Sequence, residues 1–215
     1  MSEERETREN LMDSAVREFQ EKGYAKASLR TICANAGVTT GALYFFFDSK
    51  EDLFRAIVEP PLTALVNLLC THFAEEKQML SRPDRYEHRE GDHDAFAERI
   101  IGHLYHNYDA FLLLLSKSQG TAFENSLERI VALVEEQFTS HVTLFAEQTA
   151  GRQMDEGMLH WMSHMTADAF VHLLTHERDE QKAVKRMKLM LNFIVKGFVE
   201  MVLPPEGTEE NKSVF

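Results

Sequence analysis

Residues 28–54, SLRTICANAGVTTGALYFFFDSKEDLF, decide the fold of the N-terminal quarter of the chain. The hydroxyls of Ser28 and Thr39 can each cap a short helix, one over about 28–36 and one over about 40–46. A glycine lies between the two helices and supports a tight turn, because it adopts a positive φ without strain. Two short helices joined by such a turn indicate a helix-turn-helix.

A longer helix is predicted before this pair, over about 5–22. Leu11, Ala15 and Phe19 recur at intervals of four residues and form one apolar stripe. A glycine follows the helix and acts as a C-terminal stop. Together the three helices predict a small all-α domain over residues 1–48.

The rest of the chain, residues 49–203, is predicted to form a larger helical domain. Ser49 can cap a helix that we expect to break or kink sharply at Pro60-Pro61, because each proline removes a backbone hydrogen bond. A charged, aperiodic loop over 81–93 and a mobile tail over 204–215 are also expected. The other helical patterns cover about 62–80, 94–106, 108–117, 121–149, 154–177 and 180–203.

The composition favours an all-α, cytoplasmic protein. The 215 residues are 44% hydrophobic and 27% charged, with only 10 glycines and 5 prolines, and β-branched runs bounded by Gly or Pro are almost absent. The aliphatic stretches are too short to cross a bilayer, and we expect no targeting segment at the charged N-terminus. Cys33 and Cys70 are isolated, which suits a reducing compartment better than a disulfide or a metal site.

The charge balance is acidic, with a formal net charge of −12. Residues 1–58 hold 8 Lys/Arg and 10 Asp/Glu, so that segment carries −2 and the remainder carries −10. An acidic protein attracts nucleic acid poorly as a whole. Any DNA contact must therefore come from a local basic face.

Residues 28–54, preceded by FQEKGY at 19–24, resemble the DNA-binding segment of the TetR family of transcriptional repressors. The matching positions are Ser28, Ile32, Ala36, Gly37, Val38, Gly41, Leu43, Tyr44, Phe47, Ser49, Lys50 and Leu53. The resemblance covers roughly the first 55 residues and implies a DNA-binding helix-turn-helix over 1–48. The family's second domain binds small ligands and varies widely. Cys33 departs from the family's usual Ala, and Phe46 stands where His or another polar aromatic is common.

The first turns of the helix over 40–46 are the predicted base-reading surface, and the resemblance implies the same positions. Their small side chains let the helix axis approach the major groove, and the missing Cβ of Gly41 favours that approach. The methyl groups of Thr40 and Ala42 can touch thymine methyls. Tyr44, Lys50 and Arg30 would contact phosphates, and Arg30 is also long enough to reach a guanine edge. The candidate DNA-binding residues are Arg30, Thr39, Thr40, Gly41, Ala42, Tyr44 and Lys50.

Four successive aromatic residues, 44–47, fall inside this segment. At about 100° per residue, Leu43, Phe46 and Phe47 share the side that faces the first two helices. Tyr44 and Phe45 point away from that core. The Tyr44 hydroxyl is expected to contact a phosphate, while Phe45 has no assigned role.

The larger domain carries many apolar side chains that could surround an apolar or amphipathic small-molecule effector, with a few polar anchors. The candidate ligand-binding residues are Leu69, Phe73, His103, Asn107, Phe111, Phe123, Trp161 and Met165. No cofactor is expected. Because Pro60-Pro61 lies at the domain junction, a kink there could let bound ligand tilt the DNA-binding domain and release the operator.

A homodimer is predicted, because one subunit offers few cations and two would select a palindromic operator. The helices over 154–177 and 180–203 supply the predicted interface as a four-helix bundle. The stripe Met187, Leu191, Ile194 and Phe198 is assigned to that interface. The alternative is that this stripe belongs to the subunit's own core.

The alternatives to a ligand-responsive repressor are a metal-dependent enzyme and a constitutive DNA-binding dimer. A metal-dependent all-α enzyme could use the pairs His160/His164 and His172/His176, but these spread over roughly 160° of one helix and cannot converge on one ion. We therefore expect no metal site and no enzyme, since no catalytic motif is present either. A constitutive DNA-binding dimer without a ligand stays open at this stage.

Overall fold

The structure is a computed structural model that describes residues 3–80, 93–148 and 154–202. Over these ranges the chain forms helices and no strand, which confirms the all-α prediction. The predicted tail over 204–215 and most of the predicted loop over 81–93 lie outside the described residues. The helices are α1 (Glu3–Lys26), α2 (Leu29–Asn35), α3 (Thr40–Phe46), α4 (Lys50–Leu80), α5 (Asp94–His106), α6 (Tyr108–Ser116), α7 (Ser126–Gln148), α8 (Glu156–His176) and α9 (Glu180–Val202).

The short helices α2 and α3 begin at the side-chain caps that the sequence predicts. The amide of Thr31 donates to Ser28 Oγ at 3.4 Å, and the amide of Ala42 donates to Thr39 Oγ1 at 3.2 Å. Gly37 lies between the helices with a φ of 72°, the left-handed conformation that the tight turn uses. Local sequence is therefore enough to fix this helix-turn-helix.

The regular turns of the first helix end at Gly23, as predicted, because its φ of 73° and ψ of 163° are not helical; one further turn then continues to Lys26. One helix boundary differs from the prediction. The helix predicted from residue 121 begins at Ser126. The hydroxyl of Thr121 accepts a hydrogen bond from the backbone amide of Phe123 at 3.1 Å. This local side-chain bond competes with helical backbone bonding over the residues before Ser126.

The predicted break at Pro60-Pro61 is wrong, because α4 continues through both prolines. A proline's φ is compatible with a helix, so the cost lies in the lost hydrogen bonds and in crowding of the preceding turn. Tertiary contacts offset that cost. Pro61 is buried between buried Val58 and Leu62, and its carbonyl oxygen lies 2.8 Å from His103 Nε2 of α5.

The span Lys50–Met79 of α4 has the length and mean hydropathy of a membrane-crossing helix. Its apolar residues Leu62, Leu65 and Leu69 are nevertheless buried among neighbouring helices. A central position in a helical bundle accounts for this hydropathy.

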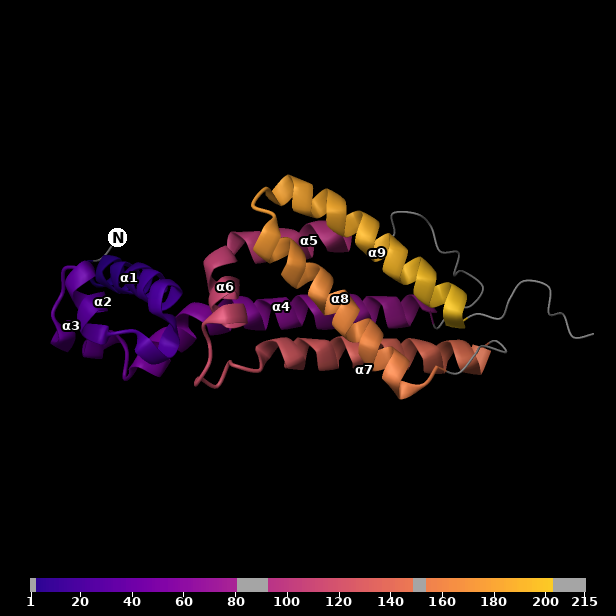
Figure 1. Ribbon diagram of the computed structural model, residues 1–215, viewed down its shortest axis with the longest axis horizontal. Helices are drawn as coiled ribbons and strands as arrows, with labels where there is room; N and C mark the ends of the chain where they lie inside the picture. Colours follow the sequence, from indigo (N-terminus) through magenta and orange to yellow (C-terminus); the bar gives the residue numbers. More distant parts are fainter. Residues whose placement is uncertain (1–2, 81–92, 149–153, 203–215) are drawn as a thin grey trace, which may run out of the picture.

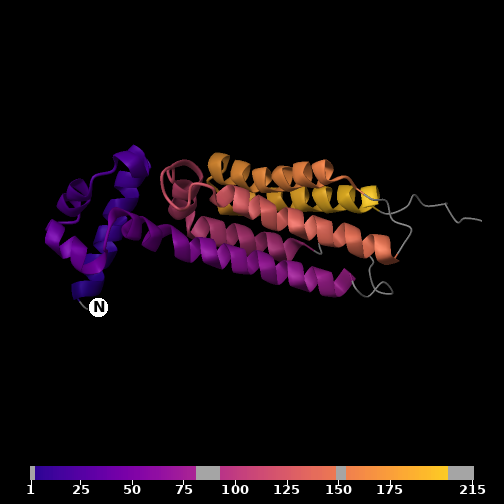
Figure 2. The ribbon, with the colours of Figure 1, turned by 90° about the horizontal axis from the view of Figure 1, so that it is seen from below.

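Helices α4–α9 form an elongated bundle, and α1–α3 lie together at one end of it (Figure 1). The view turned by 90° shows α4 leaving that end and running along the bundle (Figure 2). Within the bundle α7 packs on α8 and α5 packs on α9. Helix α6 contacts both α1 and α4, so it lies between the N-terminal unit and the bundle.

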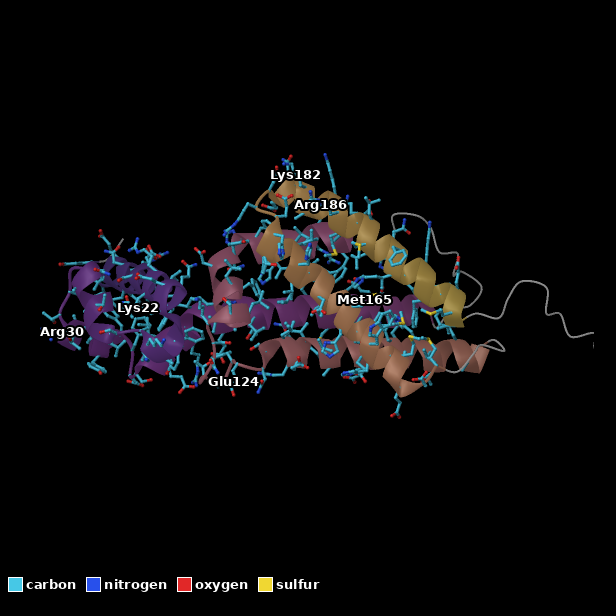
Figure 3. The ribbon with its side chains drawn as sticks, in the orientation of Figure 1. Lys22, Arg30, Glu124, Met165, Lys182 and Arg186 are labelled. Atoms are coloured by element: carbon cyan, nitrogen blue, oxygen red, sulfur yellow. The ribbon has the colours of Figure 1, made fainter. Side chains whose placement is uncertain are left out.

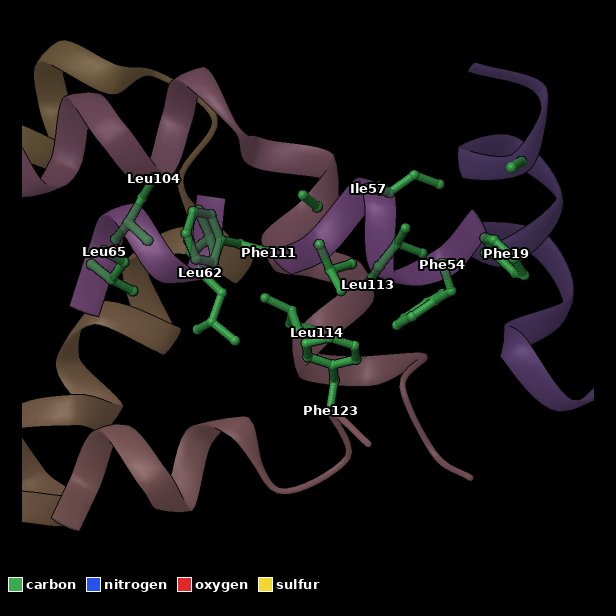
Figure 4. Close-up of a cluster of buried hydrophobic side chains, with 14 of the residues drawn as sticks. Phe19, Phe54, Ile57, Leu62, Leu65, Leu104, Phe111, Leu113, Leu114 and Phe123 are labelled. Carbon is green, nitrogen blue, oxygen red and sulfur yellow. The ribbon is translucent and has the colours of Figure 1, made fainter. Parts of the chain in front are cut away.

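One continuous apolar core joins the N-terminal unit to the bundle (Figure 4). The ring of Phe54 in α4 lies 5.1 Å from the ring of Phe19 in α1 and 6.3 Å from the ring of Phe123. The division into domains at residues 48 and 49 remains a prediction.

The apolar stripe of α9 belongs to the chain's own core, so its assignment to a dimer interface is wrong. Met187 is 0% exposed, and Leu191, Ile194 and Phe198 are 6%, 3% and 3% exposed. A different face of the same helix exposes large apolar side chains. Leu189 is 72% exposed and Phe193 is 66% exposed. Helical spacing alone cannot tell which of two apolar faces meets the subunit's own core.

Candidate DNA-binding surface, effector cavity and histidine cluster

Helix α3 is held against α1 and α2 by a small apolar core. Leu43 and Phe47 of the α3 segment are 0% and 2% exposed, and Ile32 of α2 is 0% exposed. The hydroxyl of Ser14 in α1 donates to the carbonyl of Ile32 at 2.8 Å and joins the first two helices. The direction in which α3 presents its other face is therefore fixed by buried contacts.

The four aromatic residues divide as helical geometry predicts. Phe47 is buried and Phe46 is half-buried, whereas Tyr44 is 53% exposed and Phe45 is 72% exposed. The rings of Phe45 and Phe46 meet edge to face, with centroids 5.0 Å apart. The Tyr44 hydroxyl is thus available at the surface, as a phosphate contact requires.

The first turn of α3 lies open to solvent. Thr39, Thr40 and Gly41 are exposed and Ala42 is half-buried. A Cβ added at Gly41 would meet only Thr39 Oγ1, at 3.7 Å, which is an ordinary contact. The fold itself does not require glycine here. Arg30 of α2 is also exposed, at the end of the N-terminal unit that faces away from the bundle (Figure 3).

Lys50 has a structural role that the sequence did not reveal. Its ammonium donates to the carbonyls of Tyr24 at 2.8 Å, Ala27 at 3.2 Å and Ala25 at 3.3 Å. It also lies 4.6 Å from the centre of the Tyr24 ring. Lys50 therefore caps the end of α1 from the start of α4, and its predicted phosphate contact stays a prediction.

A buried carboxylate, Glu18, fixes the start of α2. It accepts from the ammonium of Lys22 at 2.9 Å and 3.0 Å, and from the backbone amide of Ser28 at 3.0 Å. The Lys22 ammonium holds the pKa of Glu18 below its usual range against the opposing effect of burial. Sequence periodicity places this glutamate on the apolar face of α1 but does not identify its partners.

A cavity of about 80 Å³ lies between α4, α5, α6, α7 and α8. Its walls are almost entirely leucine, isoleucine, valine and phenylalanine. Five of them are labelled in Figure 4: Leu62, Leu65, Leu104, Phe111 and Leu114. The hydroxyls of Ser126 and Thr166 also line it, but they donate to the carbonyls of Phe123 at 2.8 Å and Met162 at 2.9 Å. The cavity is therefore suited to an apolar group.

Two of the eight predicted ligand-binding residues, Leu69 and Phe111, line this cavity. The other six do not, namely Phe73, His103, Asn107, Phe123, Trp161 and Met165. His103 lies against the carbonyl of Pro61, and the Asn107 amide donates to the carbonyl of His103 at 2.9 Å, so both polar groups are used within the fold. Trp161 is 60% exposed on α8. Residue type indicates burial but does not say which cavity a side chain faces.

Helix α6 connects the cavity to α1. Phe111 and Leu114 line the cavity. At the two ends of α6, Asp109 Oδ1 accepts from Gln20 Nε2 at 2.8 Å and the carbonyl of Lys117 accepts from the amide of Tyr24 at 3.1 Å. These pairs join distant parts of the sequence, so local patterns could not predict them.

Three imidazoles surround the half-buried carboxylate of Glu76. Its Oε1 lies 3.2 Å from His72 Nε2 and 3.3 Å from His93 Nδ1. Its Oε2 accepts from Gln137 Nε2 at 3.2 Å and lies 3.9 Å from His141 Nε2. Burial works to raise the pKa of Glu76, but the neighbouring histidines outweigh it and hold that pKa below the usual range. Burial lowers the pKa of His141.

No sequence pattern predicted this histidine cluster, because its members lie on α4, on α7 and at the start of α5. The histidine pairs evident in the sequence share one helix. The i, i+4 spacing of His72 and Glu76 was the one signal available from sequence.

Comparisons with known proteins agree with this geometry. Residues 11–57 match the family model described as bacterial regulatory proteins, tetR family. The regulator AcrR of Shigella flexneri is 46% identical over 57 residues, which are 26% of this chain and 26% of that protein. The repressor BepR of Brucella suis biovar 1 is 42% identical over 57 residues, which are 26% of this chain and 27% of that protein. The matches thus span about a quarter of these relatives, which are named as transcriptional regulators and not as enzymes.

The likeness to solved structures extends over the bundle as well. A transcriptional regulator from Aquifex aeolicus superposes with a TM-score of 0.58 at 20% sequence identity. The alignment covers 87% of this chain and 99% of that one. At this level of identity the comparison establishes the shared fold.

Proposed function

We propose that this chain is a DNA-binding transcriptional repressor of the tetR family that acts in the cytoplasm, because residues 11–57 match that family's model and form its helix-turn-helix. The observation that carries the proposal is the exposed first turn of α3, where Thr39, Thr40 and Gly41 present small side chains on a rigidly packed helix. A recognition helix with such a turn can lie deep in the major groove. The enzyme hypothesis has no comparable support.

Base and phosphate contacts divide between the two helices of the motif. Thr40 and Ala42 reach base edges, where their methyl groups meet thymine methyls. The exposed side chains of Tyr44 on α3 and Arg30 on α2 contact phosphates. With few cations in each subunit, the salt dependence of binding is modest for one copy and doubles in a dimer.

The repressor acts as a homodimer that binds a palindromic operator, and α8 and α9 supply the interface. Their outer faces carry Trp161, Leu189 and Phe193, which are 60%, 72% and 66% exposed. Large apolar side chains gathered on adjacent helices are typical of a surface that a partner covers. These residues replace the buried stripe of α9 as the contacts of the proposed four-helix bundle.

A small apolar effector releases the operator by widening the cavity. About 80 Å³ is roughly half the volume of an engineered cavity of about 150 Å³ that accepts benzene, so a larger effector fits only if the walls move. Phe111 and Leu114 make α6 one of those walls, and α6 contacts α1 through Asp109 and Gln20. An effector that binds only the state with the widened cavity therefore favours the position of α1 that goes with that state.

Two measurements test this proposal separately. Capture of genomic DNA fragments by the purified protein, followed by sequencing, should enrich short two-fold symmetric sites, and failure to enrich any site would remove the DNA-binding proposal. A thermal-shift screen of apolar compounds should identify ligands that raise Tm and lower operator affinity. Operator affinity that no stabilising ligand changes would instead indicate a constitutive DNA-binding dimer.

A further inference from the structure

The cluster of His72, Glu76, His93, Gln137 and His141 lies on the later half of α4, at the start of α5 and on the later half of α7. Figure 1 shows that α4 and α7 end far from α1–α3. The cluster is largely shielded from solvent. His72 and His141 are each 8% exposed, while the side chains of Glu76 and His93 are 14% and 17% exposed. Polar groups at this depth are costly unless each has a partner. Three helix segments nevertheless bring four ionisable side chains to one point.

The geometry of three of these side chains is that of metal ligands. The ligand-type atoms of His72, Glu76 and His93 all lie within 4.8 Å of one another. Two imidazole nitrogens approach the same oxygen of Glu76, at 3.2 Å and 3.3 Å. In a tetrahedral zinc site with ligand bonds of about 2.0–2.1 Å, neighbouring ligand atoms are about 3.3–3.4 Å apart. Both observed separations agree with that edge length.

The surroundings hold these ligands in orientation. The His72 ring stacks on the ring of Phe96, with centroids 3.7 Å apart and an interplanar angle of 7°. The second oxygen of Glu76 accepts from Gln137 and faces His141. Metal sites use such outer contacts to fix the ligating atoms. A carboxylate with one oxygen facing two imidazoles and the other held by an amide is prepared to bind an ion.

We propose that His72, Glu76 and His93 bind one divalent transition-metal ion of the zinc type, with Gln137 holding the second carboxylate oxygen and His141 beside it. Imidazole nitrogens with one carboxylate oxygen favour zinc and its neighbours over magnesium or calcium, which prefer oxygen ligands. The ion would join α4 to the start of α5, and α7 would support the site through Gln137. Leu69, Ile100 and Val134 on the same three helices line the effector cavity, so the ion would also fix one end of that cavity.

The test uses the full chain, stripped of metal with a chelator and titrated with Zn²⁺ against a chromophoric competitor. We expect one ion per chain. Co²⁺ in place of Zn²⁺ should give visible absorption bands of a low-symmetry site, and Zn²⁺ should raise Tm. No DNA is needed, so the result is independent of the proposed repressor function.

Single variants on α4 and at the start of α5 locate the site. His72→Gln, Glu76→Gln and His93→Gln should each weaken Zn²⁺ binding by more than about 100-fold, because loss of an outer contact such as Gln137→Ala already costs about 10–100-fold. The control is His160→Gln/His164→Gln, an i, i+4 pair on α8 with one exposed and one half-buried ring, whose centroids lie 4.6 Å apart. It should bind Zn²⁺ like the wild type.

Two results would overturn the proposal. One is a wild-type chain that binds neither Zn²⁺ nor Co²⁺ at micromolar concentration, which would leave the cluster as a set of ion pairs. The other is unchanged binding in the three ligand variants, or its loss in the control. Circular dichroism of the metal-free proteins identifies any variant that fails to fold, and the variants on the other segments then decide.

Discussion

The change Lys50→Met separates a structural role of this lysine from a role in binding DNA. A cation at the first residue of α4 is unfavourable for that helix, whose N-terminus carries partial positive charge. The same ammonium is favourable at the end of α1, where it donates to the carbonyls of Tyr24, Ala25 and Ala27. Methionine keeps the apolar stem and removes only the ammonium.

The expected loss of stability follows from these contacts. The 2.8 Å bond to the part-buried carbonyl of Tyr24 is the strongest, whereas the exposed Ala25 carbonyl can bind water instead. One hydrogen bond from a charged donor contributes about 1.5–3 kcal/mol, and the contact with the Tyr24 ring adds about 0.5–1 kcal/mol. The free energy of unfolding should fall by about 2–4 kcal/mol, which lowers Tm by roughly 4–16 °C in a chain of this size.

The assay combines thermal unfolding with operator binding at several salt concentrations, below the unfolding transition. Lys26→Met is the matched control, because it removes one exposed charge from the end of α1. We expect Lys50→Met to lower Tm while the slope of log affinity against log salt stays near the wild-type value. An unchanged Tm together with a slope that falls by about one would contradict the structural role, since that pattern marks a lost phosphate contact.

Three further predictions concern the DNA surface, a buried carboxylate and the dimer. Gly41→Ala should leave the fold intact and stabilise it by up to about 1 kcal/mol, yet weaken operator binding. An operator affinity equal to that of the wild type would mean that Gly41 does not serve close approach to the DNA. Glu18→Gln should lower the free energy of unfolding by about 1–2 kcal/mol near neutral pH, measured by urea denaturation. The pKa of Glu18 is lower in the folded protein than in the unfolded chain. The stability that Glu18 contributes is therefore fully present above the unfolded-state pKa of about 4.3 and is lost as the pH falls through the folded-state pKa. A stability difference between variant and wild type that persists in strong acid would contradict this. Phe193→Ser should weaken dimerisation at least tenfold in sedimentation experiments while changing subunit stability little, and a dimer of wild-type affinity would exclude this face of α9.

The parts of the fold that depend on neighbouring residues were predictable from sequence. Ser28 and Thr39 cap the helices that follow them, and Gly37 supplies the turn, as expected. The division of the aromatic residues also follows from helical geometry, since Tyr44 and Phe45 are exposed.

The failed predictions all required knowledge of distant contacts. The helix continues through Pro60-Pro61 because α5 packs beside it, and the sequence of α4 alone does not contain that information. The stripe of α9 that includes Met187 faces the subunit's own core, although its spacing suits a core face and a dimer interface equally well. His93 meets His72 and Glu76 because α5 begins beside the later part of α4, so the sequence shows only the i, i+4 spacing of His72 and Glu76.

The most direct test of DNA recognition by α3 compares the wild type with Thr40→Asp in genomic fragment capture. Aspartate near a helix N-terminus suits the helix dipole, so the variant should stay folded, but its charge repels phosphates. We predict that the wild type retains a small set of fragments with a two-fold symmetric site and that the variant retains none of them. Retention of the same fragments by both proteins would contradict the account.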